Sequence, residues 1–182
     1  MSHRLSVVQS ILPTTRMPSL FTPVLFRVAC LLLATPLAGS AAVFGNFTYV
    51  DNGSSITITQ YNYWLTPPDV VIPPTIAGKP VTEIGTEVFR YNGIMRTISI
   101  PATVTAIGIR AFDRCVALET VTLPPGISAI EAGTFSECIQ LTAISVPSSV
   151  VRIGAGAFVS CSKLRAIDIP LGVRVLETNT FL

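Results

Sequence analysis

Five phenylalanines recur in this sequence at a constant interval of 23 residues, and no insertion or deletion interrupts the interval. They are Phe89, Phe112, Phe135, Phe158 and Phe181. A fixed period of this length predicts a solenoid, in which each repeat forms one coil that stacks on its neighbours. Because a solenoid presents one long repetitive face, the period favours a binding surface over an enclosed active site.

Four other sets of residues keep the same interval. They are Cys115, Cys138 and Cys161; Pro101, Pro124, Pro147 and Pro170; Leu118, Leu141 and Leu164; and Ile84, Ile107, Ile130, Ile153 and Leu176. Their agreement excludes a chance run of aromatic residues. It predicts that residues 23 apart occupy equivalent positions in successive coils.

Residues 1–42 have the composition of a secretory signal peptide. The apolar run from Val28 to Ala42 follows Arg27 and ends in small residues that suit signal peptidase. The run is shorter than the roughly 20 residues that a bilayer requires, and Pro36 interrupts it. We therefore expect cleavage, export and no membrane span in the mature protein. Met17 is an alternative start, because it gives a leader of ordinary length.

Without this leader the chain is close to neutral. Three of its twelve Lys and Arg residues lie in the leader, which leaves nine against ten Asp and Glu. A neutral chain lacks the basic patch that nucleic acids require, so no nucleic-acid partner is expected.

Residues 43–69 predict a β-hairpin that caps the first coil. The β-prone runs Phe47–Val50 and Ile56–Thr59 flank the turn residues Asp51–Gly53. An uncovered end coil would expose apolar side chains and unpaired backbone groups, which such a hairpin would shield.

Residues 70–182 form the predicted solenoid. In the coil from Ala117 to Cys138, a short strand of alternating apolar residues ends at Pro124, because proline cannot donate to a β-ladder. A second short extended stretch follows, and then a tight turn or a single helical turn around Phe135. The first coil carries a five-residue insertion at 75–80, which is either ordinary turn material or a specificity loop.

The repeat resembles a known family. The matching residues are Leu118, Val121, Leu123 and Pro124, then Ile130, then Phe135 and Cys138, and the pattern resembles the BspA-like leucine-rich repeats of secreted and surface proteins. The resemblance covers about Val70 to Leu182. It implies a β-rich, right-handed leucine-rich-repeat solenoid used in adhesion or other protein recognition, with no catalytic residue.

Four positions depart from this pattern. Asn92 and Met95 replace the first Cys and the first Leu, which makes the first coil transitional. Glu131 and Glu177 stand where Gly85, Gly108 and Gly154 stand in other coils, so the position does not strictly require glycine for a positive φ.

The cysteines are expected to be buried, free thiols. Equivalent side chains in adjacent coils are parallel and about 4.7–4.9 Å apart at Cα, whereas a disulfide requires the Cβ atoms to converge. A straight row of thiols also lacks the tetrahedral arrangement that zinc prefers, so no metal is expected.

The aromatic residues are expected to be structural. The phenylalanines should pack in the core, with edge-to-face or offset rings. Tyr61, Tyr63 and Trp64 are expected to cover the first coil, while a carbohydrate-contacting patch remains the alternative.

The sequence argues against an enzyme. His3, the single histidine, lies in the leader, so a histidine-activated nucleophile is excluded from the mature chain. Gly154 and Gly156 belong to a repeat turn and do not form a phosphate-binding loop, so no cofactor is expected.

Outward-facing strand residues form the candidate protein-contact face. They are Arg96, Thr97 and Ser99; Glu119, Thr120 and Thr122; Thr142, Ala143 and Ser145; and Arg165, Ala166 and Asp168. Small, mildly polar side chains suit a broad, shallow protein contact better than a deep pocket. The alternative is a solvated sheet without a ligand.

Three functions remain open from the sequence. The first is a secreted or cell-surface recognition module that binds an extracellular protein or surface ligand. The second is a targeting or spacer domain of a larger secreted protein or enzyme, because the sequence stops at Leu182, two residues before the next expected cysteine, and we expect a truncated solenoid. The third is a structural protein that self-associates end to end through the uncovered last coil.

Overall fold

The computed structural model describes residues 39–63 and 67–181, which contain thirteen β-strands and no helix. The chain divides into two compact units, Met1–Ala34 and Thr35–Leu182, and the first lies outside the described residues. The predicted leader, its alternative start at Met17 and the side chain of Trp64 also lie outside them, apart from leader residues 39–42.

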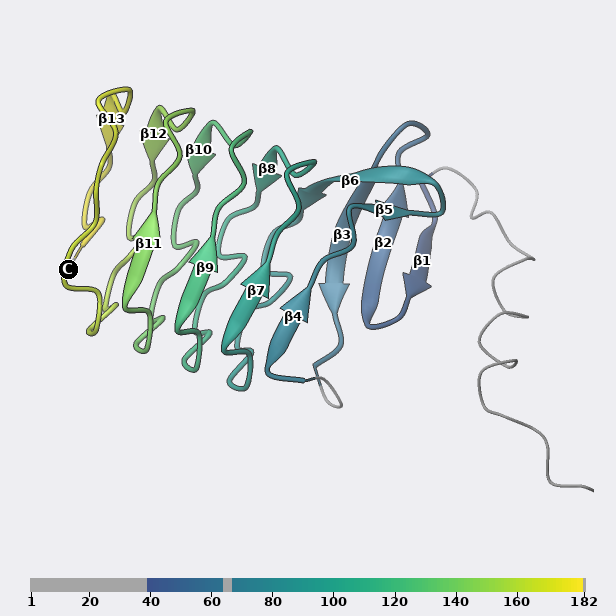
Figure 1. Cartoon of the computed structure of the whole chain (residues 1–182), viewed down its shortest axis with the longest axis horizontal. Helices are drawn as coiled ribbons and strands as arrows, with labels where there is room; N and C mark the ends of the chain where they lie inside the picture. Colours follow the sequence, from purple (N-terminus) through teal and green to yellow (C-terminus); the bar gives the residue numbers. More distant parts are fainter. Residues whose placement is uncertain (1–38, 64–66, 182) are drawn as a thin grey trace, which may run out of the picture. The chain divides into compact units, whose positions relative to one another are not determined.

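Three antiparallel strands begin the described chain. They are β1 (Ala41–Phe44), β2 (Phe47–Asp51) and β3 (Ile56–Tyr61), paired in the order β1-β2-β3 (Figure 1). The β2–β3 hairpin matches the sequence prediction, and the Asp51 carboxylate stabilises its turn by accepting a hydrogen bond from the Gly53 N–H. The sequence did not predict β1, two residues of which fall within the expected leader.

The five-residue insertion forms a second hairpin. β5 (Thr75–Ile76) pairs antiparallel with β6 (Lys79–Ile84). Between them Ala77 and Gly78 have φ values of 51° and 76°, as a two-residue type I′ turn requires. β6 then pairs in parallel with β3 on one side and β8 (Ala106–Ile107) on the other, and so joins the first hairpin to the coils.

An ion pair fastens the insertion to the hairpin. The Lys79 ammonium lies 2.6 Å from the Asp51 carboxylate, whose side chain is only 4% exposed. The hydrogen bond from Lys79, together with the one from Gly53, holds the pKa of Asp51 below its usual value. The insertion thus has a structural role here, whatever else it does.

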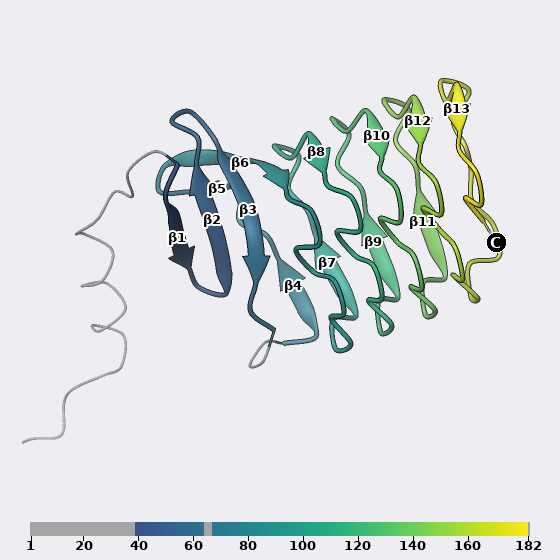
Figure 2. The same ribbon diagram turned by 180° about the vertical axis from the view of Figure 1, so that it is seen from behind.

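Two parallel ladders run along the stack of coils (Figures 1 and 2). The first contains β4 (Asp69–Val71), β7 (Thr97–Ser99), β9 (Thr120–Thr122) and β11 (Ala143–Ser145), in the order β11-β9-β7-β4. The second contains β10 (Ala129–Ile130), β12 (Arg152–Ile153) and β13 (Val175–Leu176). The sequence prediction of a β-solenoid with coils of about 23 residues is confirmed, and hydrogen-bonded turns replace any helical turn.

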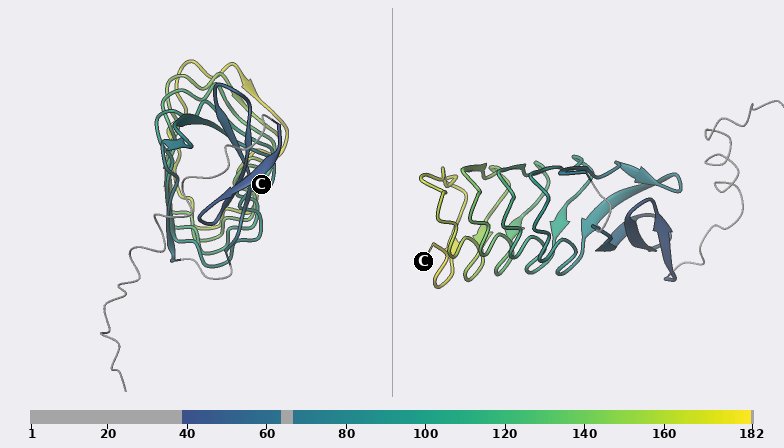
Figure 3. Two further views of the ribbon diagram at one scale, coloured as in Figure 1. Left: turned by 90° about the vertical axis from the view of Figure 1, so that its right-hand side faces the viewer. Right: turned by 90° about the horizontal axis from the view of Figure 1, so that it is seen from below.

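The coils stack along one axis (Figure 3), and a column of phenylalanine rings runs along the core inside them. From Phe89 to Phe181, consecutive rings are within 6° of parallel, and their centroids are 5.2–5.6 Å apart. Parallel rings at that separation are offset, which is one of the two arrangements expected from the sequence. The first four rings are buried as expected, but the expectation is wrong for Phe181, which is 47% exposed because, among the described residues, a ring stacks on only one side of it. Tyr61 extends the column from Phe89 to Phe47 at centroid distances of 4.9 and 5.0 Å, so its predicted covering role is confirmed.

The glycine column is explained by close approach between coils. At Gly154 a Cβ would lie 2.5 Å from the backbone nitrogen of Ala132 in the preceding coil, although φ at Gly154 is not positive. Glu131 and Glu177 replace the glycine in the coils on either side. Arg152 lies between them and contacts Glu131 at 2.6 Å and Glu177 at 3.1 Å, so it ties three coils together.

Candidate functional site

The outward positions of the first ladder form one continuous surface, which we call the strand face. Parallel pairing aligns them in two rows: Asp69, Thr97, Thr120 and Ala143, and then Val71, Ser99, Thr122 and Ser145, with Asp168 bridged to Ser145. The inward residues between them, such as Ile98 and Val121, are buried. Alternation along each strand therefore turns every second side chain outward, as a half-buried sheet requires.

Few contacts engage the side chains of this face. Thr97 donates a hydrogen bond from Oγ1 to Asp69 Oδ1 at 2.7 Å. Arg96 Nε and Nη2 donate to Glu119 Oε1 and Oε2 at 2.9 and 3.1 Å, and Thr142 Oγ1 donates to the Glu119 carbonyl. The hydrogen bond between the Arg96 and Glu119 side chains lowers the pKa of Glu119 and raises the pKa of Arg96. This exposed pair leaves no net charge beside the rows.

A shallow groove of about 420 Å³ lies at the β4 end of the strand face. Its outward lining comes from Asp69, Val71, Thr97, Ser99, Thr120 and Thr122. Four of these six side chains carry a hydroxyl, the floor of the groove is formed by valine and isoleucine, and Asp69 is the one charged side chain of the lining. The groove offers hydrogen bonds and apolar contact to a partner, and its lining contains no histidine or lysine that could activate a hydroxyl as a nucleophile.

The structure brings together the strand residues of the predicted contact face. Those on β7, β9 and β11 lie side by side as expected, and Asp168 continues their row through its bridge to Ser145. Arg165 is exposed beyond β11. Whether the face binds a partner stays a prediction.

Sequence reasoning missed Asp69 and Val71. They pair with residues 28 positions later, which is the 23-residue period plus the five-residue insertion. Subtracting the insertion that the sequence itself reveals would have placed both residues on the face.

The cysteine column has no reactive geometry. Cys115, Cys138 and Cys161 are buried, free thiols, as expected, and each Sγ donates to a phenylalanine carbonyl of the preceding coil at 3.0–3.2 Å. Burial raises the pKa of all three thiols, that of Cys161 to about 11. A raised pKa removes the thiolate needed for nucleophilic attack. Within residues 39–63 and 67–181, no cluster of three or more His, Cys, Asp or Glu side chains could hold a metal ion.

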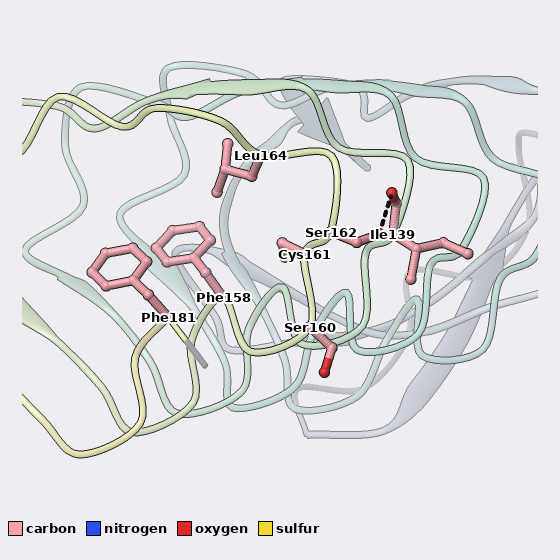
Figure 4. Close-up of a pocket in the computed structure, with 7 residues that line it drawn as sticks. All are labelled: Ile139, Phe158, Ser160, Cys161, Ser162, Leu164 and Phe181. Atoms are coloured by element: carbon pink, nitrogen blue, oxygen red, sulfur yellow. Dashed lines mark hydrogen bonds between the residues drawn. The ribbon is translucent and has the colours of Figure 1, made fainter.

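A second cavity, of about 530 Å³, lies beside the last rings of the phenylalanine column (Figure 4). It is lined by Ile139, Phe158, Ser160, Cys161, Ser162, Leu164 and Phe181. Ser162 Oγ donates to the Ile139 carbonyl at 3.4 Å. The remaining lining is mainly apolar and lies apart from the strand face, so this cavity brings no polar groups together for a reaction.

The charged side chains that sequence reasoning left unassigned gather along the turns around the phenylalanine column. We call these turns, residues 87–92, 110–115, 133–138 and 156–161, the turn edge. Arg90 contacts Glu87 at 2.8 Å and the buried Asp113 at 2.9 Å, and Arg114 contacts Glu137 at 2.9 Å. These groups pair with one another within a turn and between neighbouring coils.

Comparison with known proteins agrees with this architecture. The model of the BspA-type leucine-rich repeat region matches residues 82–182 in six copies. No curated protein matches significantly. In the described part of the chain, no helix has the length and apolar character needed to cross a membrane.

Solved structures show the same fold. A leucine-rich repeat protein of T. pallidum superposes with a TM-score of 0.71 and 31% identity over 78% of this chain and 66% of its own. A leucine-rich repeat protein of Bacteroides ovatus gives 0.67 and 30% identity over 77% of this chain and 38% of its own. One from Bacteroides capillosus gives 0.62 and 25% identity, over 70% of this chain and 96% of its own. The chain thus spans less than two thirds of the length of the first two proteins.

Proposed function

Because the chain belongs to the BspA-type leucine-rich repeat proteins, we propose that it is a non-catalytic recognition module that binds a protein through its strand face. The observation that carries this proposal is the ordered, exposed and largely uncharged surface of β4, β7, β9 and β11. Small side chains on a rigid sheet allow a partner to approach closely over a wide area, with little loss of side-chain entropy on binding.

We place this recognition outside the cell or at its surface. The apolar leader expected from the sequence supports export. The raised pKa values of Cys115 and Cys138 are compatible with such a location, because thiols that stay protonated and inaccessible resist oxidation in an oxidising compartment.

Site-specific photo-crosslinking tests the proposal. A photoreactive amino acid replaces Thr120, at the centre of the strand face, or Ser128, an exposed residue just before β10 that serves as the matched control. We expect extracellular proteins captured through position 120 to be absent from captures through position 128. Introducing Thr122→Arg beside the first probe should abolish that capture, because a bulky cation blocks close approach to the sheet.

Two results would contradict the proposal. One is capture of the same proteins from both positions, which would indicate non-specific contact. The other is capture from position 120 that the neighbouring Thr122→Arg substitution leaves unchanged. Circular dichroism of each variant checks that the coils remain folded.

A further inference from the structure

The β4 end of the strand face differs from the rest of that face. β4 is the outermost strand of its sheet, and it contributes Asp69 and Val71 to the groove. Both side chains are exposed, whereas further along the face the two rows continue as Thr and Ser and then as Ala143 and Ser145. In the two rows from β4 to β11, the carboxylate and the large apolar side chain therefore both lie on β4.

Asp69 retains acceptor capacity. Its Oδ1 accepts the hydrogen bond from Thr97, but among the described residues no cation lies within ion-pair distance of it. Arg96, the next candidate along the chain, is held by two hydrogen bonds to Glu119 and interacts with Asp69 only through the longer-range attraction of their charges. A carboxylate has about four lone-pair sites, so Asp69 can accept further bonds from a bound cation.

Val71 supplies an apolar surface next to this carboxylate. Its side chain is 68% exposed, which is high for a valine on an ordered sheet. Residues two apart on a strand face the same side and lie about 6.5 Å apart. This spacing suits a lysine or arginine side chain. Its aliphatic stem can pack on the apolar surface while its charged group reaches the carboxylate.

We propose that this end of the strand face anchors a lysine or arginine side chain from an extended segment of the protein partner. The cationic group pairs with Asp69 beside the Thr97 hydroxyl, and the stem lies over Val71. The inference rests on the proposed function, because it names the chemistry that the strand face recognises. Asp168, at the other end of the same face, lies between Ala166 and Pro170 and outside the lining of the groove at β4, so it serves as the matched acidic control.

A peptide titration followed by ¹H–¹⁵N NMR tests the anchor on the full chain. The probe is a blocked seven-residue peptide of Ser and Gly with one central arginine, and its matched control carries citrulline, a neutral side chain of nearly the same shape. We expect the arginine peptide to shift the amide signals of β4 and β7. The citrulline peptide should bind about three- to fivefold more weakly, as the loss of one exposed ion pair implies.

Variants assign the effect to residues. Asp69→Asn should reduce binding of the arginine peptide to the level of the citrulline peptide, and Val71→Ser should weaken both peptides about twofold. Asp168→Asn should change neither. Because Asp69 and Val71 are exposed, these substitutions are expected to leave the far-UV circular dichroism spectrum unchanged.

Equal affinity of the two peptides, an unaltered Asp69→Asn variant, or the absence of shifts on β4 at millimolar peptide would overturn the anchor. These failures are separable from failure of the proposed function. If the Thr120 probe still captures a partner and Thr122→Arg still abolishes capture, the strand face stands and only the basic anchor is wrong. If both experiments fail, the face has no recognition role.

Discussion

The turn edge and the strand face differ in how many of their side chains are paired with neighbouring residues. At the turn edge, Arg90 and Arg114 lie 4.6 and 5.3 Å from the Tyr91 ring centroid and also form ion pairs with carboxylates of their own or the next coil. On the strand face, exposed hydroxyls and Asp69 make few contacts with their neighbours. The turn edge has the more reactive residue types, but its charged side chains already pair with one another.

Under the proposed function, this difference separates residues that stabilise the fold from residues that recognise a partner. Side chains that pair between coils contribute to the nearest-neighbour interfaces on which a solenoid depends. Side chains left without such pairs can change without loss of folding, and they keep their hydrogen-bonding capacity for a partner. Substitutions at the turn edge should therefore alter stability, and substitutions on the strand face should alter binding.

The largest expected effect comes from the ring stack beneath the turn edge. Phe112→Ala removes a fully buried ring that stacks on Phe89 and Phe135, and should lower the free energy of unfolding by about 3–5 kcal/mol. Thr120→Ala, on the strand face of the next coil, should change it by less than about 0.5 kcal/mol. Urea denaturation followed by circular dichroism measures both. A comparable loss in the two variants would remove the distinction between the faces.

The buried thiols of the turn edge should make the free energy of unfolding depend on pH in the alkaline range. Burial raises the pKa of Cys138 above its usual value of 9.0, so the folded state keeps the proton after the unfolded state has lost it. The stabilisation is therefore complete below about pH 9 and is lost as the pH rises, by up to about 1.4 kcal/mol per pH unit for each such thiol.

A comparison of variants isolates the thiol from other alkaline effects. The free energy of unfolding is measured between pH 8 and pH 10.5, roughly the range over which unfolded thiols ionise, for the natural chain and for Cys138→Ala. The variant should show a shallower decline. Parallel curves would mean that Cys138 ionises in the folded state as it does in the unfolded chain.

A matched pair of arginines gives an intermediate effect. Arg90 contacts the buried Asp113 at the turn edge, whereas Arg96 contacts the exposed Glu119 on the strand face. Arg90→Met leaves a buried carboxylate without its cation and should lower Tm by roughly 5 °C, while Arg96→Met should change it by about 1 °C or less. Calorimetry of both variants at neutral pH makes the comparison, and the opposite order would contradict it.

Periodicity made most of the fold predictable. Residues 23 apart must occupy equivalent places in a stack, so the Phe, Cys and Ile columns and the strands before Pro124 and Pro147 follow from the sequence alone. Their members are buried except in the last coil, where Leu176 and Phe181 are exposed. Elements that do not repeat were harder to predict. Two of the four residues of β1 lie in the segment with the composition of a leader, and nothing periodic marks the ion pair of Lys79 with Asp51.

The sequence predicted the strand-face residues on the repeated strands, but not those on β4 at one end of the face. The outward positions of β7, β9 and β11 follow from alternation, but Asp69 and Val71 are displaced by the insertion and escaped notice. Charged pairing at the turn edge was unpredictable for another reason. Long side chains such as those of Arg90 and Arg114 can reach several neighbours. The position of a residue in the repeat therefore does not determine which carboxylate it pairs with.

The smallest expected effect on stability comes from the backbone conformation of the turn edge. Two columns adopt positive φ in successive coils: Glu87, Arg110, Gly133, Gly156 and Asn179, and then Tyr91, Arg114, Glu137 and Ser160, with values between 54° and 63°. Most of these residues are not glycine, so the sequence gives no sign of the left-handed conformation. Each non-glycine residue there carries a strain of about 1 kcal/mol, which the contacts between coils must offset.

Gly156→Ala measures that strain with little steric interference. The new Cβ would meet the Val159 side chain at 3.6 Å, an ordinary contact, so the expected loss of about 1 kcal/mol arises from the φ of 60°. Gly93→Ala is the control, because its Cβ also meets a valine, at 3.7 Å, in a backbone conformation without positive φ. It should be neutral or slightly stabilising, since alanine restricts the unfolded chain. If both variants lost the same free energy, crowding and not backbone conformation would explain why glycine occupies the turn edge at this coil.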